Sequence, residues 1–228
     1  MKLSRSKIDL FMECPCCFYK DVKRGIKRPP GFPFSLNGAV DTLLKKEFDF
    51  HRYNGTQHPL QIKFNIDARP ANHPQINEWR DSLHHGVAWH HPLHQCKLYG
   101  GIDDLWINSQ GEYHVVDYKA TAKSEPVTAL PGWAISYRRQ MEIYQWLLRK
   151  NNLNVSNTAY FVYCTGDTTK TGFSEKLEFN CHVIPYEGDD SWIDRTIEEM
   201  FFVLSQDRAP ASSENCDYCR FIRFNIIN

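Results

Sequence analysis

The chain has 228 residues, with 27 Lys and Arg against 27 Asp and Glu, and 42% of its residues are hydrophobic. This length fits one domain with a sizeable core, and the composition excludes disordered and collagen-like proteins. No apolar stretch approaches the roughly 18 residues of a membrane span, and Lys7 and Asp9 interrupt the apolar run that a signal peptide needs, so we expect a cytoplasmic protein.

The first half of the chain predicts two helices separated by a basic segment. Apolar residues from Ile8 to Phe11 predict a short N-terminal helix that ends at Pro15, and helical spacing predicts a second helix over about 36–50. The basic segment over 20–30 is a candidate for tracking phosphates. Residues 51–93 contain four prolines and many histidines, which favours loops around one or two short elements.

The second half alternates strands and helices. Two β-rich runs, 97–108 and 112–120, are joined by Ser-Gln-Gly and predict a hairpin. The pattern after them predicts, in order, a helix over about 134–150, strands over 158–164 and 176–184, a helix over about 191–204, and an irregular tail from Asp207. This order indicates an α/β protein.

Three residues of the expected hairpin are candidates for a catalytic site. Asp117 and Lys119 are two residues apart on one strand and share a face, and Asp103 follows two glycines in the preceding strand. If the hairpin pairs, the two aspartates can converge on Mg²⁺ or Mn²⁺, and Lys119 can orient a water or offset charge at a phosphate. The alternative is polar residues on the wet face of a strand, but Val115-Val116 favour a buried strand, where charges are costly unless used.

The expected central helix carries a second candidate pair. Gln140 and Tyr144 are four residues apart and therefore share a helix face. A glutamine amide can bind a phosphate or a base edge, and a tyrosine hydroxyl can bind a phosphate. Taken alone, the pair is better explained as a helix surface with Tyr144 packed in the core.

Two cysteine pairs have the spacing of metal ligands. Cys14-x-x-Cys17 and Cys216-x-x-Cys219 together predict a tetrahedral thiolate site for zinc or an iron–sulfur cluster, which would join the segments 1–30 and 207–228 as a clasp. Cys16 could replace Cys17, and the alternative is four unrelated thiols. The other cysteines are expected to be core residues rather than part of a disulfide framework: Cys96, Cys164 and Cys181.

Histidines cluster between residues 84 and 94. They are His84, His85, His90, His91 and His94. Because they match no helical His-Glu-x-x-His pattern, a metal role is not the expected one.

Together these pieces resemble the PD-(D/E)XK nuclease superfamily, and within it the RecB-like exonucleases that carry a cysteine-bound cluster. The motifs that carry the resemblance are, in the family's order, the opening helix from Ser4 to Phe18, Gly100-Gly101-Ile102-Asp103, Val116-Asp117-Tyr118-Lys119, Gln140-x-x-x-Tyr144 and Cys216-x-x-Cys219. The resemblance implies one nuclease-like domain over 1–228, with a restriction-endonuclease-like core in which helices flank a mixed β-sheet and a cysteine metal site joins the N- and C-terminal segments.

The resemblance also implies the activity and its residues. The protein would be a Mg²⁺- or Mn²⁺-dependent DNA exonuclease of repair, recombination or DNA processing, acting on DNA with single-stranded ends. A helicase or processing complex would be a separate partner. The implied roles are as follows: metal ligation by Asp41, Asp103, Asp117 and the Tyr118 carbonyl, catalysis by Asp103, Asp117 and Lys119, substrate orientation by Gln140 and Tyr144, and a 4Fe-4S cluster on Cys14, Cys17, Cys216 and Cys219.

The sequence departs from the family pattern twice. Asp41 stands where the family usually has a histidine in the second helix, so an alternative function is a catalytically impaired DNA-binding or scaffold protein. Position 225, where a further cluster cysteine would fall, is Asn, so Zn²⁺ competes with the iron–sulfur cluster. A third possibility is a zinc-clasped structural protein unrelated to nucleic acid.

Overall fold

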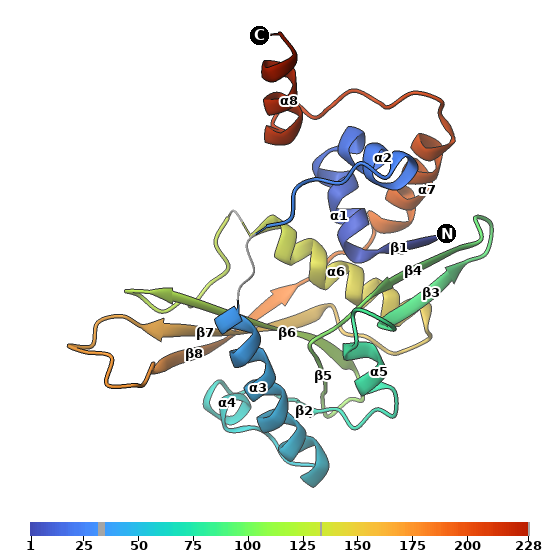
Figure 1. Ribbon diagram of the computed structural model, residues 1–228. Helices are drawn as coiled ribbons and strands as arrows, with labels where there is room; N and C mark the ends of the chain where they lie inside the picture. The colour runs from blue at the N-terminus through green and yellow to red at the C-terminus, as the bar shows by residue number, and fades with distance from the viewer. Residues whose placement is uncertain (32–34, 133, 228) are drawn as a thin grey trace. The chain divides into compact units, whose positions relative to one another are not determined.

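A computed structural model of the protein describes residues 1–31, 35–132 and 134–227 (Figure 1). The chain folds into two compact units. Unit 1 comprises Met1–Phe32, His90–Tyr99 and Ser191–Asn228, and unit 2 comprises Pro33–Trp89 and Gly100–Asp190.

Unit 2 is built on a mixed five-stranded sheet of order β2-β5-β6-β7-β8. Its strands are β2 (Arg69–Pro70), β5 (Asp104–Ile107), β6 (Tyr113–Lys123), β7 (Thr158–Asp167) and β8 (Phe179–Glu187). Strands β6 and β7 are parallel, and the other neighbours are antiparallel. The predicted hairpin is present as β5–β6, and β6 is the central strand, but the predicted run 97–108 is divided, because Cys96–Gly100 forms a strand of the other sheet.

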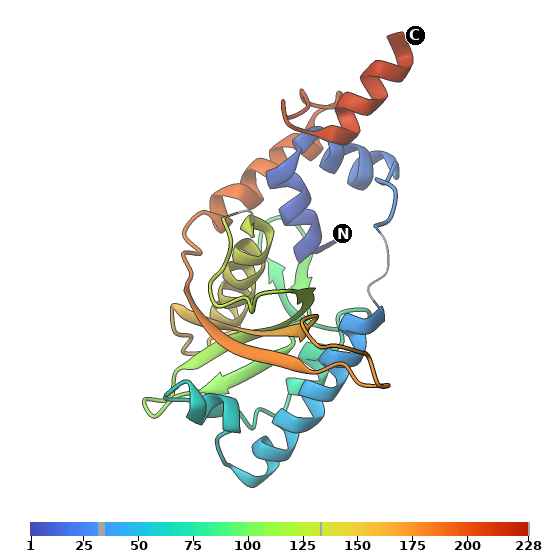
Figure 2. The same ribbon diagram turned by 90° about the vertical axis from the view of Figure 1, so that its left-hand side faces the viewer.

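Helices cover both faces of this sheet. They are α3 (Ser35–Asn54), α4 (Pro59–Lys63), α5 (Ile76–Arg80) and α6 (Ile135–Lys150). Leu44 and Phe48 of α3 pack with Val116 and Tyr118 of β6 in a buried cluster. Because side chains alternate along a strand, Asp117 and Lys119 face the opposite side, which α6 covers (Figure 2). The α/β sheet flanked by helices is confirmed.

Unit 1 is mostly helical. It contains α1 (Arg5–Glu13), α2 (Pro15–Arg24), α7 (Ile193–Ser205) and α8 (Asp217–Ile227), together with β1 (Lys2–Ser4). Strand β1 pairs in parallel with β4 (Cys96–Gly100) in a three-stranded sheet that also includes β3 (Val87–His91), whose last two residues belong to unit 1. Helix α7 packs against both α1 and α2.

The structure corrects two expectations about the chain ends. Pro15 does not end helical structure but begins α2, since a proline at the first helical position lacks only an N–H that has no partner there. The tail is not irregular throughout, because α8 forms from Asp217. Part of the basic segment is used internally: Lys23 and Arg24 donate to backbone carbonyls at and after the end of α7, including Leu204 and Asp207.

Cys164 and Cys181 form a disulfide, which contradicts their expected role as unpaired core residues. They are directly opposite each other in the β7–β8 register, with their Cα atoms 4.2 Å apart. The register of two strands is a tertiary property, so the spacing of the cysteines along the chain did not reveal the pair. No helix of the described residues is long and apolar enough to cross a membrane.

Candidate active site

Asp117 and Lys119 lie on the central strand β6, on the face covered by α6. The Asp117 side chain is fully buried, and the Lys119 ammonium lies against its Oδ2. The Lys119 ammonium also lies 4.6 Å from the centre of the Tyr137 ring of α6. Strand β6 pairs on both sides, so its neighbours hold the backbone that carries the two charges.

Gln140 and Tyr144 reach the same place from α6. Gln140 donates from Nε2 to Asp117 Oδ1 at 2.7 Å, and the same nitrogen lies 3.2 Å from the Tyr144 hydroxyl. The predicted helix face is therefore turned toward the carboxylate. In this arrangement Gln140 fixes the rotamer of Asp117, and the predicted contact of Gln140 and Tyr144 with substrate stays a prediction.

Asp103 lies in the short loop between β4 and β5, beside β6, and not in a strand as the sequence predicted. Strand β5 begins at Asp104, opposite Val116, so the Tyr118 N–H lies beyond the end of that pairing. Asp103 Oδ2 accepts this N–H at 2.9 Å. One hydrogen bond thus holds Asp103 against the strand that carries Asp117 and Lys119. The glycine before it is required: a Cβ on Gly101 would lie 2.5 Å from the Ser82 Cβ.

Asp41 of α3 is linked to this site through Lys45. The Lys45 ammonium is 2.8 Å from Asp41 Oδ2 and 3.8 Å from Asp103 Oδ1. Asp41, Asp103 and Asp117 do not form a group whose ligand atoms all lie within 4.8 Å of one another, whereas two other groups of described residues do. The structure therefore brings Asp103, Asp117 and Lys119 together, with Asp41 separated from Asp103 by a lysine.

The electrostatics of the site favour a cation. Burial and the charge of Asp117 raise the pKa of Asp103 to about 7, against the opposing effect of Lys119 and Lys45. Burial works against the charge of Lys119, but Asp117 and Asp103 outweigh it and raise its pKa. Asp117 Oδ2 is buried and lies against the Lys119 ammonium. Two adjacent carboxylates are a donor set that fits Mg²⁺ or Mn²⁺.

A buried ion network lies next to the site and supports it. The sequence motifs did not indicate this network. Asp104 is fully buried, and its carboxylate is bound by the guanidinium groups of Arg52 and Arg80 and by the Tyr118 hydroxyl, the last two at 2.8 and 2.7 Å. Arg80 also donates to the Asp103 carbonyl at 3.0 Å. The network therefore holds the backbone of the candidate Asp103 and the ring of Tyr118. Tyr118 lies between the candidates Asp117 and Lys119 on β6. Its only sequence signal is a second aspartate directly after Asp103.

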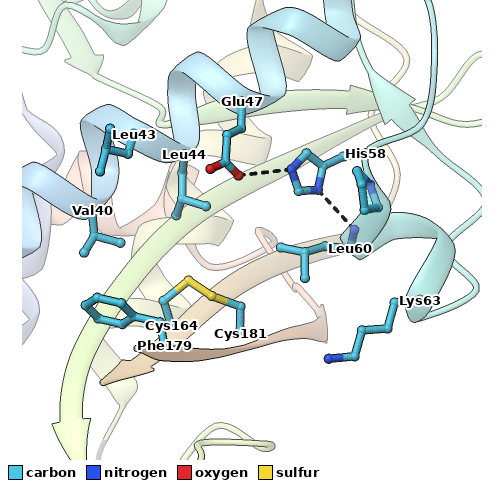
Figure 3. Close-up of a pocket in the computed structure, with 11 residues that line it drawn as sticks. Val40, Leu43, Leu44, Glu47, His58, Leu60, Lys63, Cys164, Phe179 and Cys181 are labelled. Atoms are coloured by element: carbon cyan, nitrogen blue, oxygen red, sulfur yellow. Dashed lines mark hydrogen bonds and ion pairs between the residues drawn. A yellow bond between two sulfur atoms is a disulfide. The ribbon is translucent and has the colours of Figure 1, made fainter. Parts of the chain in front are cut away.

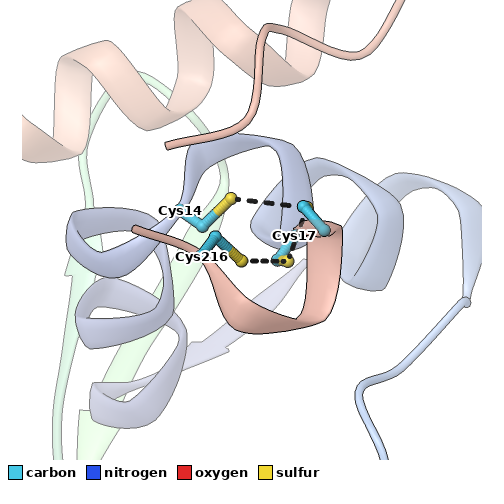
Figure 4. A group of neighbouring side chains, drawn as sticks. Cys14, Cys17 and Cys216 are labelled. Carbon is cyan, nitrogen blue, oxygen red and sulfur yellow. Dashed lines mark hydrogen bonds between the residues drawn. The ribbon is translucent and has the colours of Figure 1, made fainter. Parts of the chain in front are cut away.

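The four predicted cysteine ligands gather in unit 1, and Figure 4 labels three of them, Cys14, Cys17 and Cys216. The sulfur atoms of Cys14, Cys17, Cys216 and Cys219 all lie within 4.8 Å of one another. Each Cys-x-x-Cys pair is at the start of a helix, α2 or α8, so three residues bring its two sulfurs to one side. Cys17 is in the group and Cys16 is not, and Cys17 stays the predicted ligand.

The surroundings of these sulfurs shift the pKa values of their thiols in different directions. Burial raises the pKa of the Cys14 thiol, but hydrogen bonds from the Cys17 and Ser213 backbone outweigh it and lower the value to about 6. Burial raises the pKa of Cys17 and Cys219. Arg28 donates to Cys216 Sγ at 3.5 Å. Four clustered cysteine sulfurs are a donor set that fits zinc or an iron–sulfur cluster.

A separate apolar pocket of about 500 Å³ lies in unit 2 between α3, α4 and the β7–β8 hairpin. The Cys164–Cys181 disulfide forms part of its wall, and His58 lies 3.4 Å from Glu47 at its edge (Figure 3). Burial lowers the pKa of His58. The pocket shares no residue with the Asp103–Asp117–Lys119 site.

The model of the PD-(D/E)XK nuclease superfamily matches residues 36–224. The chain belongs to this superfamily. The matched range contains α3, the β5–β6 hairpin, α6 and the second cysteine pair, and the mixed sheet flanked by helices is consistent with the restriction-endonuclease-like fold. Membership in the PD-(D/E)XK superfamily implies a nuclease that acts on DNA. The superfamily usually uses divalent metals.

Comparison with individual proteins adds less than the superfamily match. The crystal structure of SSO0001 is similar to this chain at 14% sequence identity and a TM-score of 0.40, over 100% of this chain and 85% of that chain. A likeness at this level carries no argument about the PD-(D/E)XK site. No curated protein matches the chain.

Proposed function

We propose that this protein is a Mg²⁺- or Mn²⁺-dependent DNA exonuclease of the RecB-like type, acting in the cytoplasm in repair, recombination or DNA processing. The observation that carries the proposal is the buried Asp117, joined by Asp103 and Lys119 at one point of the central strand. Paired charges in a core are costly, and a site that binds a cation and a phosphate gives them a use.

Asp103 and Asp117, with the Tyr118 carbonyl and Asp41 as further ligands, would hold the divalent cation. When bound, this cation supplies Lewis-acid polarisation of the phosphate and lowers the pKa of a water. For Asp41 to join, its contact with Lys45 must break, which would free the Lys45 ammonium for a phosphate oxygen. The Gln140 amide binds Asp117 Oδ1 and leaves Oδ2 facing the Lys119 ammonium.

Lys119 would act on the scissile phosphate. Its ammonium is held charged by the two aspartates, so it can offset negative charge that develops as water forms a new P–O bond and the bond to the leaving oxygen breaks. Gln140 and Tyr144 would orient the strand, and DNA with single-stranded ends is the proposed substrate. A separate helicase or processing complex would supply such ends.

The cysteine group would hold a 4Fe-4S cluster or, in its place, Zn²⁺. Support for this comes from four sulfurs within 4.8 Å of one another and from the Arg28 hydrogen bond to one of them. A metal ion there would tie Cys14 and Cys17, at the start of α2, to Cys216 and Cys219, at the start of α8. The metal content of purified protein distinguishes iron from zinc.

The Asp41–Lys45 ion pair favours a second candidate function, a catalytically impaired nuclease fold that binds DNA or a partner. If Lys45 keeps Asp41 and Asp103 from sharing a cation, the protein would bind DNA without cutting it. The two functions differ in one result: whether bound DNA is hydrolysed in the presence of Mg²⁺ or Mn²⁺.

Cleavage of end-labelled single- and double-stranded DNA with Mg²⁺ or Mn²⁺ tests the proposal. We expect Lys119→Ala to slow cleavage by at least about 100-fold while DNA affinity changes much less. Lys123→Ala is the matched control, because Lys123 is an exposed lysine on the same strand, and it should cleave like the wild type. Absence of cleavage by the wild type would reject the exonuclease, and equal rates for both variants would reject the assigned site.

A further inference from the structure

Two histidines and a glutamate of unit 1 form a cluster that the nuclease chemistry does not use. His91 is the last residue of β3, His94 lies in the turn before β4, and Glu198 is on α7. His91 Nε2 is 3.3 Å from Glu198 Oε1, and His94 Nε2 is 3.0 Å from Glu198 Oε2. One ligand atom from each residue lies within 4.8 Å of the other two.

We propose that His91, His94 and Glu198 form a further metal site, which takes a borderline divalent transition metal such as Zn²⁺. Imidazole nitrogens and a carboxylate oxygen are ligands that zinc prefers. Zinc bonds of about 2.0–2.1 Å place tetrahedral ligand atoms about 3.3 Å apart, close to the separations of the two nitrogens from the carboxylate oxygens. The three residues supply three positions, and water takes the fourth.

The surrounding side chains hold the cluster in shape. The His94 ring stacks on Phe201 with centroids 3.8 Å apart, and the His91 ring lies 5.7 Å from the same ring. Phe201 follows Glu198 by one helical turn on α7, so one helix positions the carboxylate and supports both imidazoles. Prior positioning of this kind lowers the entropy that metal binding must remove.

Ring tautomers set the strength of the site. The His91 Nδ1 accepts a long 3.3 Å hydrogen bond from the Leu93 N–H, so the neutral ring carries its proton on Nε2. A metal at Nε2 requires the proton on Nδ1 instead, and that hydrogen bond is lost. Because the Glu198 side chain is 55% exposed, the metal can enter from solvent. These features describe a site that binds a metal reversibly and then fixes the 91–94 turn to α7. The cysteine group differs because its sulfur-bearing residues are buried.

Sequence spacing did not indicate this site. His91-x-x-His94 has no acidic partner nearby in the chain, and Glu198 follows more than a hundred residues later. The fold of unit 1 brings α7 to the turn and completes the ligand set. The site shares no residue with the cysteine group or with the Asp103–Asp117–Lys119 site.

Calorimetric titration of the chelator-treated, full-length protein with Zn²⁺ tests the proposal. The other metal sites are common to all variants, so the difference between variants isolates this one. We expect the wild type and the control H84Q/H85Q to bind one more zinc equivalent than H91Q/H94Q. The control removes two exposed histidines that belong to no such group.

Glu198→Gln is the second variant, because an exposed glutamate is replaced without loss of the ring packing around Phe201. It should weaken the same equivalent at least about tenfold. It also keeps the test decisive if H91Q/H94Q fails to fold. Identical zinc stoichiometry and affinity for wild type and Glu198→Gln would overturn the proposal.

Discussion

Replacing Asp104 by Asn tests how the fold supports the active site. Asp104 is fully buried, and Arg52 and Arg80, both nearly buried, bind its carboxylate together with the Tyr118 hydroxyl. Asparagine keeps the shape but removes the negative charge and turns an acceptor into a donor. Among the described residues, the two buried guanidinium groups then share one carboxylate, that of the half-exposed Asp49.

The expected loss of stability follows from this charge balance. Removing one partner of a buried ion pair lowers the free energy of unfolding by about 3–5 kcal/mol. Because Asp49 still contacts both arginines, we expect the lower end, about 3 kcal/mol, or about 6–12 °C in the melting temperature. An exposed pair on a helix contributes about 0.5 kcal/mol or less.

Urea unfolding followed by tryptophan fluorescence is the assay, because five of the six tryptophans belong to unit 2. The control is Glu199→Gln, which breaks the exposed Arg195–Glu199 pair on α7. It should change the free energy of unfolding by no more than about 0.5 kcal/mol. A loss for Asp104→Asn as small as that of the control would refute the role given to the network.

Two further outcomes concern pH and metal removal. Burial and Asp117 raise the pKa of Asp103 to about 7, so the metal-free folded chain keeps a proton that the unfolded chain releases near pH 4. The free energy of unfolding should therefore fall as the pH rises from about 4 to 7. Urea titrations should find this fall weakened in Asp103→Asn, and parallel curves for the two proteins would contradict it. Cys216→Ser should lose the metal of the cysteine group while Cys96→Ser, a buried thiol outside the group, keeps it, as elemental analysis can measure. Equal metal content in both variants would argue against a metal site at these cysteines.

Local periodicity explains what could be predicted of the site. The two-residue spacing of Asp117 and Lys119 placed both on one face of a strand, and the four-residue spacing of Gln140 and Tyr144 placed both on one face of a helix. These relations depend only on the geometry of a single element. That the two faces meet, with Gln140 bound to Asp117, required the tertiary structure.

The rest depended on contacts between distant segments. Arg52 and Arg80 come from α3 and α5. Both lie within residues 51–93, where prolines and histidines obscured the helices. Nothing in the spacing linked them to Asp104, so the network was missed. Lys45 between Asp41 and Asp103 was missed for the same reason.

The prediction of structure at the chain ends was wrong for a different reason. Proline disrupts helix interiors but suits the first helical position, so Pro15 alone was ambiguous, and the structure begins α2 there. Helix α8 is short, and its first turn carries the second cysteine pair. A metal at that pair would stabilise the helix, and the helix propensity of the tail residues does not include this contribution.

The proposed hydrolytic site is tested most directly by the rate of DNA cleavage with Asp117→Asn in Mg²⁺ or Mn²⁺. This variant keeps the size of the side chain and an acceptor for Gln140 but removes the charge that would hold the cation. We expect the single-turnover rate to fall by at least about 100-fold while the protein stays folded and binds DNA. Cleavage by Asp117→Asn at the wild-type rate would contradict the proposed site.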